Sequence, residues 1–213
     1  MNTALSSYLD ALRWRYATKI FDPSIKLPQS TVDGLVEAMR LTASSMGMQA
    51  WKIISVEDPA IRQQLLAVSN GQRQVVDASH LFVLCRPKHT TLDLATRHLE
   101  NTAKVRGIPL ESLGGFKQFM EGFLTNPPVD LQPWLDAQLY IMMGNLLSAC
   151  AVAEVDACPM EGFSKKGYDS VLGLEKLDLQ STLVIPVGIR SQDDKYAKLA
   201  KVRYPVSEIF LTL

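Results

Sequence analysis

The stretch Trp134–Val155 limits the fold of this chain more than any other segment, because it combines helical length with apolar side chains on nearly every side. Five polar residues interrupt it: Asp136, Gln138, Asn145, Ser148 and Glu154. A transmembrane helix needs about 20 mostly apolar residues, and these interruptions argue against one. A helix that is apolar all round is otherwise a buried helix. We therefore expect a central helix, buried by its own subunit or by a partner subunit, and no membrane.

The composition fits one folded domain without a general attraction for nucleic acid. The chain has 213 residues, of which 47% are hydrophobic and 21% charged, so a sizeable core is within reach. Lys and Arg together number 22, as do Asp and Glu, which leaves no net charge at neutral pH. No repeat, low-complexity tract or Gly/Ser linker divides the chain, so residues 1–213 are expected to form a single domain.

The cysteines and the N-terminus favour a cytoplasmic protein. Cys85, Cys150 and Cys158 are odd in number and form no CxxC pair, which is typical of reduced thiols rather than a disulfide framework. Residues 1–7 lack a basic region followed by an apolar core, so we expect no signal peptide.

The pattern of apolar residues predicts an α+β fold with a mixed central β-sheet flanked by helices. Helices are expected, in addition to the apolar stretch, at residues 5–14, 28–41, 58–68, 90–105 and 111–124. Strands are expected at residues 51–56, 80–85, 155–160 and 181–187. The tail 208–213 also predicts a strand, isolated from the others and suited to pairing with the sheet of another chain.

The common motifs of covalent, metal and nucleotide chemistry are absent from the sequence. There is no GxGxxG or GxxxxGK[ST] phosphate loop, no HExxH zinc motif and no GxSxG nucleophile elbow. His80, His89 and His98 are nine residues apart, a spacing that does not place them on one helix face, so we expect no metal site. Cys85 lies in an apolar run and is interpreted as a core residue.

Two compact basic clusters stand out in this otherwise neutral chain. Arg15 and Lys19 lie four residues apart just after a short amphipathic run, and Lys201 and Arg203 lie near the other end. Such clusters indicate a local anionic ligand, for example a phosphate, although each alone is more often a solvated surface. Since no side-chain constellation for covalent or metal chemistry accompanies them, a cofactor that carries the chemistry itself would reconcile these observations.

Four segments in this order resemble the FMN-dependent nitroreductase family, of the oxygen-insensitive NAD(P)H nitroreductase and dihydropteridine reductase type. They are Arg15–Lys19, the polar loop Thr42–Trp51, Pro159–Phe163 and Lys201–Arg203. Supporting pieces are Gly71–Gln74 before Asp77–His80, and Ala137–Tyr140 followed by Gly144-Asn145. The resemblance runs from Arg13 to Thr212, over nearly the whole chain.

The resemblance implies an interlocked homodimer with two FMN molecules at the subunit interface and no catalytic side chain, because the flavin N5 atom accepts the hydride. It assigns the phosphate to Arg15, Lys201 and Arg203, and the pyrimidine edge of the ring to Lys19. The partner subunit would contribute Ser44 and Ser45. Backbone at Glu161 and Gly162 would approach N5, and Gln138 would lie near the ribityl chain or ring. The remaining cofactor contacts that we expect are Tyr16, Ala17, Gly47, Gln72, Gln74, Pro159 and Met160.

Substrate-pocket residues are expected from the loop and from the variable region before the apolar stretch. Met46 belongs to the loop, and Phe116, Phe119 and Phe123 recur at helical spacing. Such a stripe indicates core packing or a lid over the flavin, and we assign Met46, Phe119 and Phe123 to the pocket.

Several positions depart from the common pattern of the family. Ala17 stands where Ser is frequent, Gly47 where Asn is frequent and Ala50 where Pro precedes the Trp. Gln74 stands where some members carry a Lys near the ring. Ala17 removes one hydroxyl on the phosphate side, the contacts to the ring are the part that these departures affect, and the phosphate cluster is intact.

The function that the resemblance implies is that of an FMN-dependent NAD(P)H oxidoreductase. Hydride would pass from NAD(P)H to N5, and two electrons would then pass to a nitroaromatic, quinone or pterin acceptor in a ping-pong cycle. An alternative of the same fold is a specialised flavin enzyme, dehalogenase-like or flavin-fragmenting. An alternative of a different class is a non-enzymatic flavin- or tetrapyrrole-binding protein. A structural interpretation makes the apolar helix an oligomerisation element and the basic residues plain surface.

Overall fold

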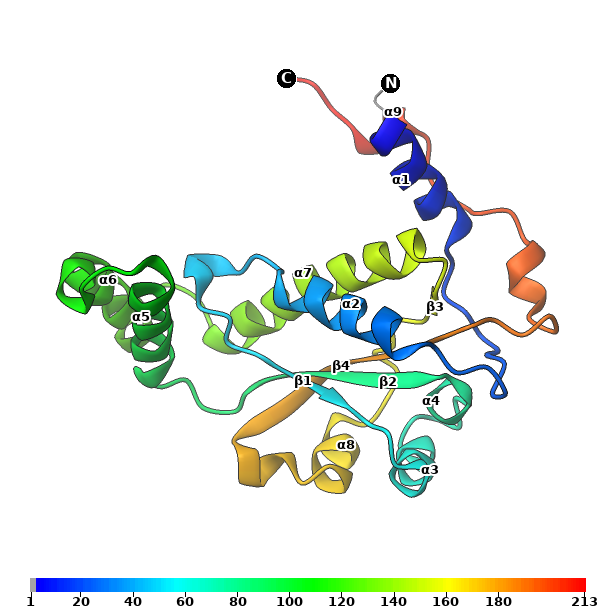
Figure 1. Cartoon of the computed structure of the whole chain (residues 1–213), viewed down its shortest axis with the longest axis horizontal. Coiled ribbons are helices and arrows are strands. Elements are labelled where there is room, and N and C mark those ends of the chain that lie inside the picture. The colour runs from blue at the N-terminus through cyan, green and yellow to red at the C-terminus, as the bar shows by residue number, and fades with distance from the viewer. Residues whose placement is uncertain (1–2) are drawn as a thin grey trace.

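Two layers of helices cover the two faces of a central sheet (Figure 1). The computed structural model describes residues 3–213. The helices are α1 (Thr3–Trp14), α2 (Gln29–Arg40), α3 (Pro59–Ala67), α4 (Gln74–Asp77), α5 (Asp93–Arg106), α6 (Gly114–Thr125), α7 (Leu131–Val152), α8 (Lys165–Val171) and α9 (Val206–Ile209). The strands are β1 (Lys52–Ser55), β2 (His80–Pro87), β3 (Asp156–Ala157) and β4 (Leu179–Gly188). Short 3₁₀ turns lie at Ser45–Gly47, Leu110–Leu113, Leu174–Leu177 and Lys195–Lys198.

The sheet has the order β1-β2-β4-β3, and neighbouring strands run antiparallel. The long central pair, β2 and β4, is in register from His80↔Val187 to Pro87↔Leu179, with a shift between Leu84 and Cys85. Parallel pairing within residues 3–213 is limited to the bridge Ala17↔Ala157. The predicted α+β class, with a sheet flanked by helices, is confirmed, and the parallel part of the sheet is this one bridge.

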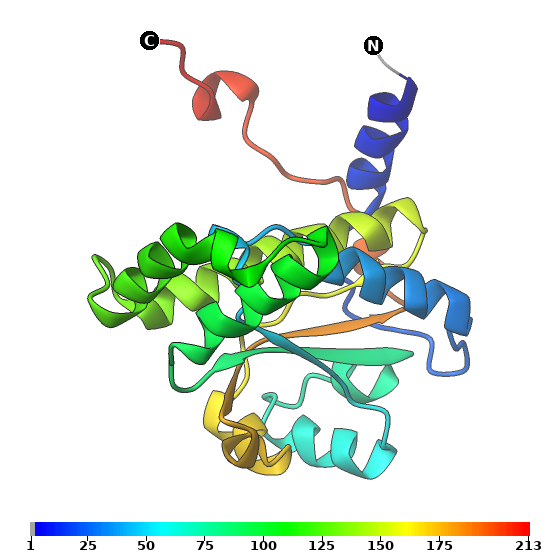
Figure 2. The same cartoon turned by 60° about the vertical axis from the view of Figure 1, so that its left-hand side comes forward.

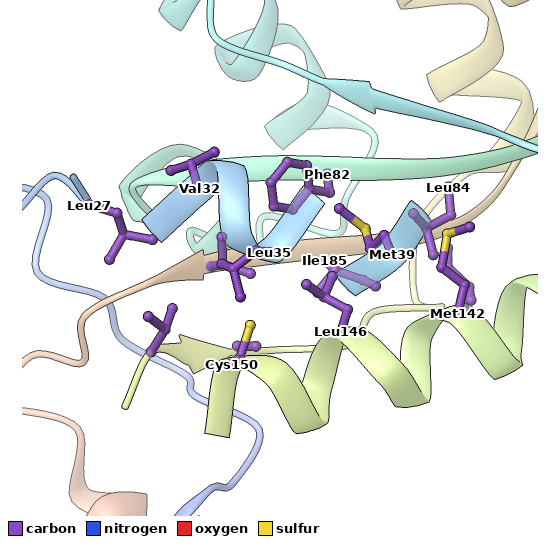
Figure 3. Packing of buried hydrophobic residues seen from close by; sticks show 14 of the residues in the cluster. Leu27, Val32, Leu35, Met39, Phe82, Leu84, Met142, Leu146, Cys150 and Ile185 are labelled. Atoms are coloured by element: carbon purple, nitrogen blue, oxygen red, sulfur yellow. The ribbon is translucent and has the colours of Figure 1, made fainter. Parts of the chain in front are cut away.

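The central strands bury side chains on both faces of the sheet, because successive residues point to opposite sides. Phe82 and Ile185 point toward α2 and α7, where they pack with Leu35, Met39 and Leu146 (Figure 3). The residues of the opposite face, such as Val83 and Val184, join a second cluster under α3, α4 and α8. Each fully buried side chain of this size contributes about 1.5–3 kcal/mol of transfer free energy, so both layers stabilise the sheet.

Helix α7 is buried along one face only. Leu139, Met142 and Leu146 are fully buried against the sheet and α2. On the opposite face, Tyr140, Ile141 and Val152 are 41%, 50% and 63% exposed. Among the described residues, α7 is the one helix long and apolar enough to cross a membrane, a test that core helices of soluble proteins also pass. The rest of the chain thus covers one face of the apolar helix that the sequence predicts.

Both ends of the chain project from the body (Figure 2). Helix α1 has no buried residue, and residues 201–213 are all exposed. The predicted strand at 208–213 is wrong in this structure: Glu208 and Ile209 belong to α9, and 210–213 lie in no strand. Pro205, with φ of −63°, precedes the turn, and Phe210 N donates to Val206 O at 2.9 Å. A local turn satisfies these backbone groups, whereas a strand needs a neighbouring strand.

Gly188, the last residue of β4, offers a stability prediction. A Cβ atom there would lie 2.9 Å from the backbone N of Ser79 and 3.1 Å from Cδ1 of Phe21. We expect Gly188→Ala to lower the free energy of unfolding by about 1–3 kcal/mol in a urea titration, because packed backbone has to move. Gly122→Ala in α6 is the matched control: no atom lies within 4 Å of its Cβ position, and we expect about 0.5–1 kcal/mol of stabilisation. Equal unfolding midpoints for the two variants would contradict this packing argument.

Candidate functional site

The segment Arg15–Lys19 links α1 to the body and runs beside β3. Ala17 pairs with Ala157 in the parallel bridge, and Thr18 N donates to Ala157 O at 3.4 Å. This pairing brings both cations close to Cys158. Burial raises the pKa of the Cys158 thiol, and the neighbouring charges of Lys19 and Arg15 oppose that rise. The first predicted cation pair therefore lies at the end of β3.

The second cation pair comes to the same place from the other end of the chain. Lys201 Nζ donates to the backbone O of Arg15. Burial, and then the charge of Arg203, lower the pKa of Arg15. Burial, and then the charges of Arg203 and Arg15, lower the pKa of Lys201. No carboxylate within residues 3–213 forms an ion pair with any of the three. Three cations that repel one another without a counter-charge form a site that favours an anion. We call Arg15, Lys201 and Arg203 the cation cluster.

A strip of backbone leads from the cation cluster along the end of the sheet to Gly162. Met160 pairs with Val184 through Met160 N to Val184 O at 2.8 Å. Gly162 O accepts hydrogen bonds from Gln72 Nε2 at 2.8 Å and Asn70 Nδ2 at 2.9 Å. The hydroxyl of Tyr140 donates to the carboxylate of Glu161. From Cys158 to Gly162 an extended chain spans about 13 Å, so the strip could follow an elongated ligand.

The loop after α2 is folded into a strained shape. Met46, Gly47 and Gln49 have φ of 55°, 66° and 47°, the left-handed region. Ser45 N donates to Gln138 Oε1 at 2.8 Å, and Gln49 N donates to Ser44 Oγ at 3.0 Å. Sparsely populated backbone conformations of this kind gather at functional sites.

His98 explains why glycine stands at position 47. A Cβ atom on Gly47 would lie 2.8 Å from His98 Cε1, so a side chain there would collide with the imidazole ring. The loop and α5 also line an open pocket of about 610 Å³, which Gln49, Trp51 and His98 border. The positive φ and the imidazole of His98 together favour glycine at this position.

Within one chain, the loop and the cation cluster lie at different ends of α7 (Figures 1 and 2). The loop is bonded to Gln138, near the start of the helix. Arg15 lies near Cys150, whose thiol pKa burial raises and the Arg15 charge lowers. Gln138 and Cys150 are twelve positions apart, which corresponds to about 18 Å of helix. The structure does not bring Ser44 and Ser45 to the cation cluster.

A comparison with known protein families decides where this fold and site belong. The profile described as the Nitroreductase family matches residues 12–189, most of the chain. The chain belongs to the nitroreductase family.

Two bacterial proteins that are provisionally named NAD(P)H nitroreductases are similar to this nitroreductase in sequence. One, from Staphylococcus epidermidis, is 29% identical over 208 residues, covering 93% of this chain and 94% of the relative. The other, YfkO of Bacillus subtilis, is 32% identical over 202 residues, covering 88% and 90%. A nitroreductase of Exiguobacterium sibiricum solved in complex with FMN superposes with a TM-score of 0.81 at 18% identity, covering 97% of each chain. That structural likeness concerns the fold.

The nitroreductase brings some predicted cofactor residues together and places others in supporting positions. Gln74 is buried, and its side chain acts to lower the pKa of the Cys158 thiol, as the charge of Lys19 also does. The hydroxyl of Tyr16 donates a hydrogen bond to Asp194 Oδ2 at 2.9 Å. Ala17 contributes backbone pairing, and Met160 is buried with its backbone paired to β4. Pro159 is half-buried in the strip.

The predicted pocket residues of the nitroreductase gather near the loop end. Met46 packs against the cluster that contains Met48 and Leu99. Phe119 is 60% exposed, whereas the ring of Phe123 packs on Trp134 with centroids 5.1 Å apart. Their role as substrate contacts stays a prediction.

Sequence reasoning missed three residues that shape this site: Asn70, His98 and Asp194. Asn70 and Gly71 both have positive φ, and an Asn-Gly pair is a turn signal that could have drawn attention to this position. His98 and Asp194 act on segments far away in the sequence, so no local pattern identifies them. Among residues 3–213, no group of three or more His, Cys, Asp or Glu could hold a metal ion.

Proposed function

We propose that this protein is an FMN-dependent NAD(P)H oxidoreductase. The observation that carries the proposal is the convergence of Arg15, Lys201 and Arg203 without a carboxylate partner. A phosphate monoester carries a charge of about −1.5 to −2 at neutral pH, and convergent cations bind it through charge-assisted hydrogen bonds. The relatives named as NAD(P)H nitroreductases and the neighbour solved with FMN support this choice of ligand.

The residues that lead away from the cation cluster fit the rest of an FMN molecule. The strip of about 13 Å offers backbone along an elongated ligand, and Gly162 at its far end has no side chain to hinder close approach. Arg15, Lys201 and Arg203 would hold the phosphate, and Lys19 would stabilise negative charge at the ring. When bound, FMN supplies hydride chemistry between NAD(P)H and an electron acceptor.

We further propose that a second copy of the chain completes each site. Helix α7 exposes an apolar face, α1 buries nothing, and the loop lies apart from the cation cluster. A groove of about 560 Å³ between α2 and α7 is lined by small side chains such as Gly34, Ala38 and Ala149. A partner subunit could cover this surface and bring its Ser44 and Ser45 to the cation cluster, giving a homodimer with two sites.

The catalytic cycle that we propose is ping-pong. NAD(P)H and a small acceptor, a nitroaromatic, quinone or pterin, would use the same pocket in turn. The side chains of the protein orient ligands and stabilise charge, and none acts as a nucleophile. We expect the single domain 1–213 to work in the cytoplasm.

The visible spectrum of the purified protein tests the proposal. We expect flavin absorption, about one FMN per chain, and NAD(P)H oxidation with menadione or nitrofurazone as acceptor. FMN-free protein provides the control, and adding FMN should restore its activity. Protein without flavin absorption that binds no added FMN and oxidises no NAD(P)H would refute the proposed function.

A further inference from the structure

The carboxylate of Asp194 lies between the two segments that carry the cations. Its side chain is almost completely enclosed, with 1% of the residue exposed. We propose that Asp194 is a positioning residue, which holds the Arg15–Lys19 segment in register with the Lys201–Arg203 segment so that both meet one phosphate. The inference rests on the proposed function and adds a residue to the proposed site.

Asp194 binds the first segment through one oxygen atom. Asp194 Oδ2 accepts hydrogen bonds from Lys19 N at 2.7 Å, Ile20 N at 3.1 Å and Tyr16 OH at 2.9 Å. The residues Tyr16–Ile20 belong to no helix or strand beyond the bridge at Ala17. Apart from Asp194, they are held at Thr18, which bonds to Ala157 O and Asp156 Oδ1, and at Ile20 O, which accepts from Ser191 N at 2.9 Å. Asp194 is the acceptor for both backbone N–H groups at Lys19 and Ile20, so it fixes the backbone at the point from which Lys19 projects.

Asp194 directs the second segment through its other oxygen atom. Asp194 Oδ1 accepts from Tyr196 N at 3.0 Å, which caps the turn Lys195–Lys198. The chain leaves this turn and reaches Lys201, whose ammonium group returns to the backbone O of Arg15. The same carboxylate thus caps the turn that leads to the second cation segment and binds the backbone of the first.

The charge of Asp194 is maintained by hydrogen bonds and not by a cation. Burial acts to raise its pKa, but the N–H groups of Lys19, Ile20 and Tyr196 and the Tyr16 hydroxyl outweigh burial and lower it. The other buried carboxylate nearby, Asp156, forms an ion pair with Arg190 at 2.7 Å, whereas Asp194 has no ion pair within residues 3–213. Burying a carboxylate without a cation is costly. A role in positioning the two cation segments accounts for a buried carboxylate at this place.

Asp194→Asn tests the inference because the amide keeps the size of the side chain and loses one acceptor. Its NH₂ group would face N–H donors, so the two segments should shift relative to each other. We expect the Kd for FMN to rise roughly 10- to 100-fold. Riboflavin has the same ring but no phosphate, so its Kd should change much less. The readout is therefore the ratio of FMN to riboflavin affinity, measured by quenching of flavin fluorescence on FMN-free protein.

Asp193→Asn is the matched control, because Asp193 is exposed and its side chain contacts neither cation segment. It should bind both flavins like the wild type. If Asp194→Asn does not fold, Tyr16→Phe removes one donor to the same oxygen and should lower the same ratio by a smaller factor. Parallel weakening of both flavins, or an unchanged FMN affinity in a folded Asp194→Asn variant, would overturn the inference. A wild-type protein that binds no FMN would instead refute the proposed function on which the inference rests.

Discussion

Replacing Arg15 by Gln is expected to weaken FMN binding by about 100-fold, because charge-assisted hydrogen bonds contribute up to about 3 kcal/mol. Arg15 is the half-buried member of the cation cluster, and both Lys201 and Arg203 lie close enough to affect or contact it. Its loss would remove the cation closest to the body of the protein. Fluorescence titration of FMN-free protein measures the change.

The same substitution should leave the ligand-free protein no less stable. In the folded state, burial and Arg203 lower the pKa of Arg15, so folding disfavours the charged form of this side chain. Removing the charge should then keep or raise the urea concentration at which the FMN-free protein unfolds. Loss of ligand affinity without loss of stability is the signature of a binding residue.

Arg13→Gln is the control for this prediction. Arg13 lies two residues earlier on α1, is exposed and pairs with Asp10 at 2.7 Å. Its replacement should leave FMN affinity within about twofold of the wild type, since exposed ion pairs contribute little. Equal effects of the two variants would show that the region acts through general charge and would count against the cation cluster.

The core could be predicted because its signals are local. The apolar run at residues 80–85 is part of β2, and Asp58 caps α3 by accepting from Ala60 N at 2.8 Å. Helices α4 and α8 were not predicted, because four and seven residues are too few for a clear period. The prediction of a strand at residues 208–213 failed for another reason. A segment of β-like composition forms a strand only beside another strand, and a local turn after Pro205 competes with the strand.

The candidate site could be predicted only in part. The cations stand out as two compact groups in a neutral sequence, so their meeting could be expected. The groups that orient the cations could not be predicted. Asp194 is 175 sequence positions from Lys19, which it contacts, and no local pattern distinguishes it from the other aspartates. The glycine at position 47 similarly depends on His98, which approaches it from α5. Long-range contacts of this kind are decided by the fold and not by neighbouring residues.

Mixed dimers should recover FMN sites that neither parent variant has. Ser45 is exposed and bonds to the body through its backbone N–H, so Ser45→Glu should fold while repelling a phosphate-bearing ligand. If each site combines the cation cluster of one chain with the loop of the other, Arg15→Gln and Ser45→Glu damage opposite halves. In a mixed dimer one site then carries both changes and the other carries neither.

Random pairing of the two variants makes half of the dimers mixed, so about a quarter of all sites should bind FMN like the wild type. The measurement is tightly bound FMN per chain after the two denatured variants are refolded together. Arg15→Gln refolded with Lys201→Gln is the matched control, because both changes lie in the same half and every site keeps one of them. If the first pair recovers no more FMN than the control pair, the loop and the cation cluster do not meet across a subunit interface. Recovery in the first pair alone would require that two chains build each site.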